Sequence, residues 1–297
     1  MKWSWKIGEF AGIGVYMHAT FLLIIAWVIL LHWSAGHDVA TIVSGVIFVL
    51  ALFLCVVLHE FGHALTAQRF GIKTRDITLL PIGGVARLER MPDDPMQEFW
   101  VALAGPAVTL VIALLLFFWL RITGTYVPVD SITMTQGSFV ERLMLVNVFL
   151  LVFNMIPAFP MDGGRVLRAL LALRTDYTSA TQTASTIGQA IALIFGFVGL
   201  FTNPFLIFIA LFVWIGAAQE ASMVKIKSAL GGIPVYKAML TDYKTAAPGD
   251  RLKHLVDLTM SGSQQDFPVV DDGRLVGIVP HADLIKGLSE KGETVPV

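Results

Sequence analysis

The chain has 297 residues, of which 56% are hydrophobic and 14% are charged, and its formal net charge is −1. A soluble domain carries about 25% charged residues because its surface must be wettable, so this composition excludes an ordinary soluble protein and favours a polytopic α-helical membrane protein. The net charge gives no sign of a nucleic-acid partner, and the single cysteine excludes an intramolecular disulfide and a cysteine-based metal site.

Six apolar segments predict six transmembrane helices, because a helix that spans a bilayer needs about 20 apolar residues. The last two segments are short and almost adjacent, so they predict a helical hairpin whose second arm opens at Pro204. The segments are residues 15–33, 42–67, 97–120, 139–159, 184–201 and 204–218.

Residues 78–87 lie between the second and third predicted helices and are too short to span a membrane, yet too apolar for an ordinary loop. Gly83 and Gly84 suit a tight turn between two short strands. We therefore expect a membrane-edge β-hairpin here, with a plain interfacial loop as the alternative.

The distribution of basic residues predicts the orientation. Connections on one side carry most of the Lys and Arg of the membrane part, whereas those on the other side carry only Arg121 and Arg142. Basic loops stay in the cytoplasm, so both termini are expected to be cytoplasmic. Because no eukaryotic targeting signal is found, we expect a multi-pass protein in the lipid bilayer of the cytoplasmic (inner) membrane of a prokaryote.

The composition changes near residue 232, after which no long apolar run occurs. Residues 251–261 predict a helix, and two short β runs joined at residues 271–273 predict a hairpin. The predicted organisation is therefore a transmembrane domain at 1–220, a linker at 221–234 and a small soluble α/β module at 235–297.

The second predicted helix contains His59-Glu60-Phe61-Gly62-His63. Histidines four residues apart lie about one turn apart on one helix face, where one zinc ion can bridge them. The glutamate beside the first histidine can then reach a water molecule and take its proton. Such residues are costly inside hydrocarbon, so a functional metal site is favoured over a chance match.

A hydrolytic zinc site uses three protein ligands and leaves one position open, so a third ligand must come from elsewhere in the chain. Asp162 is the candidate, because it follows a stretch in which Pro157 and Pro160 break the fourth predicted helix. Irregular backbone at membrane depth lies only against protein or a water-filled cavity, so the carboxylate is expected to point inward. The alternative is that Asp162 caps the following helix.

The two motifs together resemble those of the site-2 proteases, the intramembrane zinc metalloproteases of regulated intramembrane proteolysis. The His59-Glu60-x-x-His63 motif is followed, about a hundred residues later, by Asn154-x-x-Pro-x-x-Pro-x-Asp162-Gly-Gly, and the resemblance covers residues 1–220. It implies one Zn²⁺ per chain held by His59, His63 and Asp162, with Glu60 as general base. Asn154 matches the motif asparagine, which polarises the scissile carbonyl or stabilises the oxyanion, unless it bonds the carbonyls freed by the prolines.

The resemblance also implies the substrates, which are single-span membrane proteins cut within or near their transmembrane segments. A helix hides its peptide bonds, so the segment must unwind first, and the edge of the β-hairpin could receive it as an added strand. We expect an active site nearer the cytoplasmic side, and good substrates to carry Gly, Pro or Asn near the cut.

Residues 235–288 resemble a CBS domain, through Phe267-Pro-Val-Val and Gly277-Ile-Val-Pro280-His-Ala-Asp283. Such modules come in pairs that bind adenosine nucleotides. One copy is present and the chain ends about where a second would begin, so we expect a pair cut short. Pro280 replaces the usual Ser or Thr, while Asp283 remains to hold a ribose. Regulation by an adenosine nucleotide, or a homodimer through this module, is the expectation.

Two rival functions use the same residues: a zinc-binding scaffold without catalysis, and a transporter with His59, His63 and Asp162 as an ion relay. Glu60 favours the protease, because a scaffold needs no base. A transporter predicts a matching half-motif in an inverted repeat, and the sequence contains none.

Overall fold

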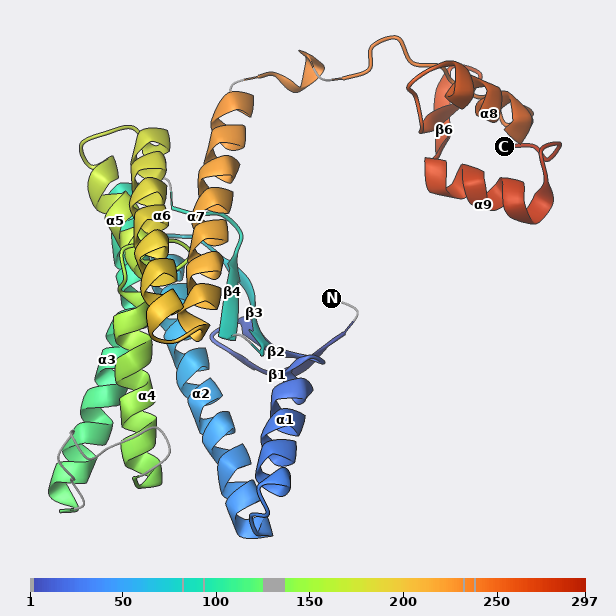
Figure 1. Cartoon of the computed structure of the whole chain (residues 1–297). Coiled ribbons are helices and arrows are strands. Elements are labelled where there is room, and N and C mark those ends of the chain that lie inside the picture. The colour runs from blue at the N-terminus through green and yellow to red at the C-terminus, as the bar shows by residue number, and fades with distance from the viewer. Residues whose placement is uncertain (1–2, 82, 93, 125–136, 232, 238) are drawn as a thin grey trace. The chain divides into compact units, whose positions relative to one another are not determined.

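The computed structural model describes residues 3–81, 83–92, 94–124, 137–231, 233–237 and 239–297. The chain divides into two compact units, Met1–Ala229 and Leu230–Val297. Figure 1 shows the first unit as a helical bundle with a small sheet at one side. The second unit is a separate small α/β fold.

The first unit opens with two strands, β1 (Ser4–Phe10) and β2 (Ile13–His18), which pair antiparallel. The sequence predicted a helix from residue 15, but the helix α1 (Phe21–Ser34) begins only after β2 ends. The predicted start of the helix was therefore wrong. The apolar residues of a half-buried strand raise the mean hydropathy of a segment as those of a helix do, so the strand and the helix were not distinguished.

The predicted β-hairpin is part of a larger sheet. Strands β3 (Thr74–Leu80) and β4 (Gly83–Leu88) pair antiparallel, and β2 pairs parallel with β3, giving the order β1-β2-β3-β4. Strand β4 begins at Gly83, so Gly83 and Gly84 belong to the strand rather than to a turn; Ile82, just before them, lies outside the described residues. Strand β4 is therefore an edge of the sheet.

An ion pair joins the two strands of the hairpin, because Arg87 Nε donates to Asp76 Oδ1 at 2.8 Å. Burial alone would raise the pKa of the Asp76 carboxyl, but the hydrogen bonds from Arg87 and Thr78 outweigh it and hold that pKa below its usual value. The sheet packs on α2 (Val39–Arg69) through a core of buried apolar residues. That core comprises Ile13, Phe61, Ala64 and Ile77.

The remaining helices of the bundle are α3 (Pro95–Ile122), α4 (Phe139–Asn154), α5 (Asp162–Ala172), α6 (Tyr177–Phe201) and α7 (Phe205–Leu230). Asp or Ser side chains cap the starts of α2, α3, α4 and α6 by accepting backbone N–H groups. Helix α7 continues to Leu230, so most of the residues expected to form the linker are helical; Gly232 lies outside the described residues.

Four of these helices are long and apolar enough to cross a membrane: α2, α3, α6 and α7. Helices α1 and α4 have 14 and 16 residues, which is short of a full span. The fourth predicted helix ends at Asn154 instead of residue 159. The protein is thus a helical membrane-type protein with four candidate spans among its described residues, and the count of six is not confirmed.

Residues 155–161 join α4 to α5 by an irregular path that is possible only because two glycines follow it. A Cβ at Gly163 would lie 2.6 Å from the Met155 carbonyl carbon, and one at Gly164 would lie 2.6 Å from that of Ala158. The connecting segment therefore runs against the first turn of α5. Asp162 is the first residue of that helix and Met161 is its N-cap, so Asp162 does not cap the helix.

The second unit contains α8 (Leu252–Ser261), β5 (Phe267–Asp271), β6 (Arg274–Val279) and α9 (His281–Lys291). Strands β5 and β6 form an antiparallel hairpin whose turn places Asp272 and Gly273 at φ of 45° and 76°, as the Asp-Gly pair predicts. The core of this unit is formed by buried apolar side chains from both helices, from β5 and from the segment before α8. They are Ala246, Leu252, Leu255, Phe267 and Leu284.

Candidate metal centre

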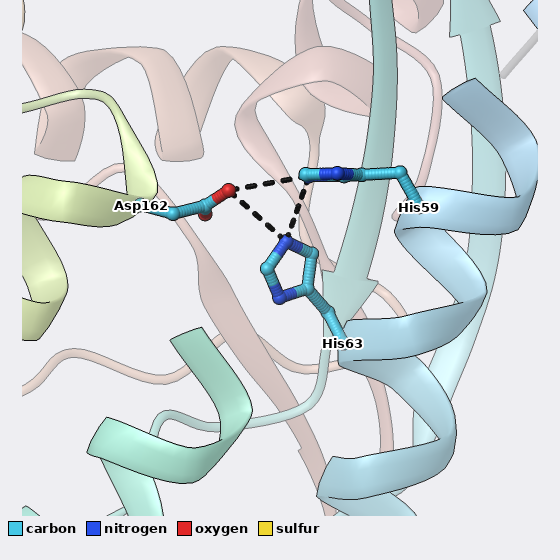
Figure 2. A group of neighbouring side chains, drawn as sticks. All are labelled: His59, His63 and Asp162. Atoms are coloured by element: carbon cyan, nitrogen blue, oxygen red, sulfur yellow. Dashed lines mark hydrogen bonds and ion pairs between the residues drawn. The ribbon is translucent and has the colours of Figure 1, made fainter. Parts of the chain in front are cut away.

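Three of the residues predicted from sequence meet inside the bundle. Asp162 Oδ2 lies 3.2 Å from His59 Nε2 and 3.3 Å from His63 Nε2, and the two histidine nitrogens are 3.1 Å apart. Figure 2 shows both imidazoles projecting from α2 towards the carboxylate at the start of α5. Among the described residues, these are the group of His, Cys, Asp and Glu side chains whose ligand atoms could hold a metal ion.

The outer nitrogens of both histidines are held by α3. His63 Nδ1 lies 2.7 Å from the carbonyl oxygen of Val101, which can only accept, so Nδ1 carries the proton. His59 Nδ1 lies 2.9 Å from Thr109 Oγ1, which is itself 3.4 Å from the Gly105 carbonyl oxygen. The Thr109 hydroxyl donates to that carbonyl and accepts from His59.

These bonds decide what the centre can bind. With Nδ1 protonated on each neutral imidazole, each Nε2 presents a lone pair, and the carboxylate presents another. Three acceptor atoms therefore converge without a donor hydrogen between them. A bound cation would remove the repulsion between these acceptor atoms. Two imidazoles and one carboxylate form a ligand set that suits Zn²⁺ and leaves one coordination position open.

Gly105 brings α3 against the two histidines. A Cβ at this position would lie 2.7 Å from His59 Nε2 and closer still to His63 Nε2. Only glycine leaves the Nε2 atoms unobstructed on that side.

The centre lies in the wall of a cavity of about 380 Å³. Glu60 and Asn154 line the same cavity, together with residues 83–86 of β4. Glu60 Oε2 accepts a hydrogen bond from the Ala86 N–H at 3.1 Å, which ties this carboxylate to the edge strand. A Cβ at Gly84 would lie 2.8 Å from Glu60 Cγ, so Gly84 lets β4 approach α2.

Family models match both parts of the chain: that of peptidase family M50 at residues 47–141 and 121–195, and that of the CBS domain at residues 231–290. A zinc metalloprotease of Methanocaldococcus jannaschii is 35% identical over 292 residues, which are 96% of this chain and 80% of that protein. The chain belongs to peptidase family M50.

The chain is also similar to a solved structure and to a second curated protein. The solved structure of the site-2 protease from Methanocaldococcus jannaschii matches with 37% identity and a TM-score of 0.53, covering 74% of this chain and 95% of that one. Stage IV sporulation protein FB of Bacillus subtilis is 30% identical over 156 residues, which are 52% of this chain and 51% of that protein. This M50 peptidase is a zinc metalloprotease of the site-2 type.

The structure therefore brings His59, His63 and Asp162 into mutual contact and places Glu60 and Asn154 around the same cavity. It shows no side-chain hydrogen bond of Asn154 among the described residues, so the expected alternative of bonding to carbonyls freed by the prolines is not observed.

Sequence reasoning missed the contribution of α3 to this M50 site. The Ala104-Gly105-Pro106 stretch reads as simple helix packing, and Val101 acts through its backbone, which no side-chain pattern reveals. Thr109 could have been singled out from the sequence, because a hydroxyl in an apolar helix, one turn after that stretch, needs a hydrogen-bond partner.

Proposed function

We propose that this M50 peptidase hydrolyses peptide bonds within or near the transmembrane segments of single-span membrane proteins, as in regulated intramembrane proteolysis. One observation carries the proposal: converging His59, His63 and Asp162 acceptors form the wall of a cavity inside a helix bundle, and the edge of a β-sheet lines that cavity.

In this proposal His59 and His63 hold one Zn²⁺ through Nε2, and Asp162 holds it through its carboxylate. Val101 and Thr109 orient the two imidazoles by fixing their Nδ1 protons. When bound there, the ion supplies Lewis-acid polarisation and lowers the pKa of a water molecule.

Glu60 is the proposed general base. It stands outside the set of metal ligands, and its carboxylate faces the cavity from α2, where the Ala86 N–H orients it. It takes a proton from water and later delivers it to the leaving amine. Asn154 lines the cavity with its carboxamide unbonded to any other described residue, so it is free to donate to the carbonyl oxygen on which negative charge develops.

Strand β4 is the proposed docking edge for the unwound substrate. It ends the sheet order and contributes Gly83, Gly84, Val85 and Ala86 to the cavity. Backbone pairing with β4 would satisfy peptide groups that lose their helical bonds, each of which costs about 4 kcal/mol when left unpaired in hydrocarbon. Substrates with Gly, Pro or Asn near the cut are therefore expected to be cleaved faster than all-Leu segments.

We also propose where this protein lies in the cell and how it is regulated. The protein lies in the cytoplasmic membrane with both termini in the cytoplasm and the active site nearer that side, as the basic loops indicate. The proposed domains are a protease domain at 1–220 and a CBS module at 235–297, and the proposed linker at 221–234 includes the last residues of α7. The CBS module regulates the protease by binding an adenosine nucleotide, with Asp283 on the ribose, or by forming a homodimer.

Zinc content and cleavage test the proposal together. Zinc per chain is measured on detergent-purified wild type, Asp162→Ala, His63→Ala and Glu60→Gln, and each protein is then offered a panel of single-span peptides in vesicles. We expect about one zinc in wild type and Glu60→Gln, loss in the other two, and cleavage by wild type alone. If Asp162→Ala retained zinc, Asp162 would not be the third ligand. A zinc-loaded wild type that cuts no peptide would contradict the proposed activity.

A further inference from the structure

Asn147 is a buried carboxamide on α4 that no part of the sequence reasoning singled out. It is fully buried, and its Nδ2 donates to the Leu143 carbonyl oxygen at 2.8 Å. This bond fixes the orientation of the amide, because a carbonyl can only accept. The Oδ1 atom is then the free end, and it has no hydrogen-bond partner among the described residues.

Asn147 lines the same cavity as the metal centre. It lies seven residues before Asn154, so the two carboxamides share one face of α4 about 10 Å apart along the helix. On the facing helix, Cys55 stands one turn before His59 and also lines the cavity. Polar lining therefore continues beyond the metal centre, towards the more apolar half of α2.

The Cys55 thiol of α2 interacts with the Asn147 side chain. A thiol is only a weak donor, and it makes no hydrogen bond to Asn147 Oδ1. The thiol therefore does not replace the strong donor that a buried amide oxygen requires.

A buried acceptor without a partner costs about 1–3 kcal/mol, and such groups are rare in folded proteins. An unpartnered acceptor at the wall of a substrate cavity is explained if the substrate itself brings the hydrogen-bond donor. A transmembrane segment that unwinds for cleavage carries freed N–H groups, and these are the donors that an orphan oxygen at membrane depth would meet.

Building on the proposed function, we propose that Asn147 Oδ1 accepts a peptide N–H of the unwound substrate. An extended chain rises about 3.3 Å per residue, so about 10 Å corresponds to roughly three residues. The bonded N–H thus lies about three residues from the scissile bond, on the side away from Asn154. Asn147 is a specificity residue: proline, which lacks an N–H, is excluded at that one substrate position although it helps unwinding elsewhere.

An amide-to-ester scan tests this bond, because an ester keeps the chain shape and removes one N–H. The probe is a synthetic single-span peptide that wild type cleaves, with single esters at successive positions around the cut. Affinity for each peptide is measured in detergent on Glu60→Gln, which binds without cutting, and on the double variant Glu60→Gln/Asn147→Leu. Zinc content is measured on both.

We expect one ester, about three residues from the cut, to weaken binding to Glu60→Gln by about tenfold. The double variant should bind the all-amide peptide about as weakly and show no further loss with that ester. The matched control is the double variant Glu60→Gln/Leu150→Val, which alters a cavity-lining side chain on the same helix but no acceptor, and it should keep the ester effect. A purely structural role for Asn147 would instead weaken all peptides equally and reduce zinc content.

A flat ester profile, or the same profile with and without Asn147, overturns the inference while leaving the protease intact. Proline scanning of the peptide with wild type provides a second test that needs no Asn147 variant. Cleavage should fail at the same position and persist with proline at its neighbours, and tolerance of proline there would also overturn the inference. If wild type cleaves no peptide, the proposed function fails and this inference falls with it.

Discussion

Two clusters of buried charged side chains share helix α5, which carries Asp162 at its first residue and Arg168 six residues later. The Arg168 guanidinium is fully buried, donates from Nε to Glu98 Oε1 at 2.8 Å and pairs with Glu220 of α7. It also lies 4.9 Å from the ring centroids of Phe159 and Tyr177. Within the described part of the chain the metal centre has no such donor, since its three ligands turn acceptor atoms towards one another.

The difference separates a structural cluster from a ligand set. In the Arg168 cluster a cation meets two carboxylates and two aromatic faces, so the chain supplies its own counter-charges. Among the fully buried polar atoms of this cluster that the structure describes, Glu98 Oε2 alone lacks a hydrogen-bond partner. In the metal centre the chain supplies acceptors and leaves the cation to come from solution. The first cluster should therefore govern folding, and the second should govern metal binding.

Removal of the Arg168 guanidinium is expected to have the largest effect. Arg168→Ala leaves two carboxylates without their counter-ion and opens a void between two rings, which should cost about 3–5 kcal/mol of stability. Thermal unfolding in detergent measures the loss. Arg174→Ala, an exposed arginine just beyond the same helix, is the control and should change little. Equal unfolding temperatures for the two variants would contradict the claim that the Arg168 cluster governs folding.

Removal of the metal should affect only the second cluster. A ligand present at about a thousand times its Kd stabilises the folded state by about 4 kcal/mol. A chelator should therefore lower the unfolding temperature of wild type and leave that of Asp162→Ala unchanged. Arg168→Ala, where it folds, should keep the chelator response. A wild type indifferent to the chelator would contradict the metal assignment.

The same contrast explains what the sequence could and could not predict. His59, Glu60 and His63 are close in sequence, so helix geometry alone places them together. Asp162 could be predicted from sequence because the prolines and glycines around it mark a break in a transmembrane helix. The strand β2 was missed because its apolar residues merged with the following helix, and the contribution of α3 was missed because it depends on backbone approach between distant helices.

The burial of Arg168 was likewise not predicted, because its sequence neighbours give no sign of the carboxylates that meet it. Glu98 and Glu220 lie 70 and 52 residues away in the chain. Only the packing of α3, α5 and α7 reveals that this basic residue is buried.

The hydroxyl of Thr109 offers a finer test of the metal centre. Thr109→Val keeps the shape of the side chain but removes the acceptor that orients His59 Nδ1, so zinc affinity should fall by about 10–100-fold. Competition with a chromogenic chelator measures the affinity. Thr181→Val is the matched control, because that buried hydroxyl bonds to the Tyr177 carbonyl on its own helix. Equal losses in both variants would indicate a general packing effect.

The smallest expected effect distinguishes the two carboxylates that pair with Arg168. The Glu98 side chain is 3% exposed and the Glu220 side chain 31% exposed, so water screens the second ion pair and hardly reaches the first. Glu98→Gln should cost about 2 kcal/mol, as a buried hydrogen bond to a charged group does, and Glu220→Gln less than about 1 kcal/mol. Neither change should alter zinc content, because both carboxylates belong to the cluster that the chain neutralises itself. If Glu220→Gln reduced zinc binding while Glu98→Gln did not, the two clusters would be coupled through α7, and the division between them would have to be given up.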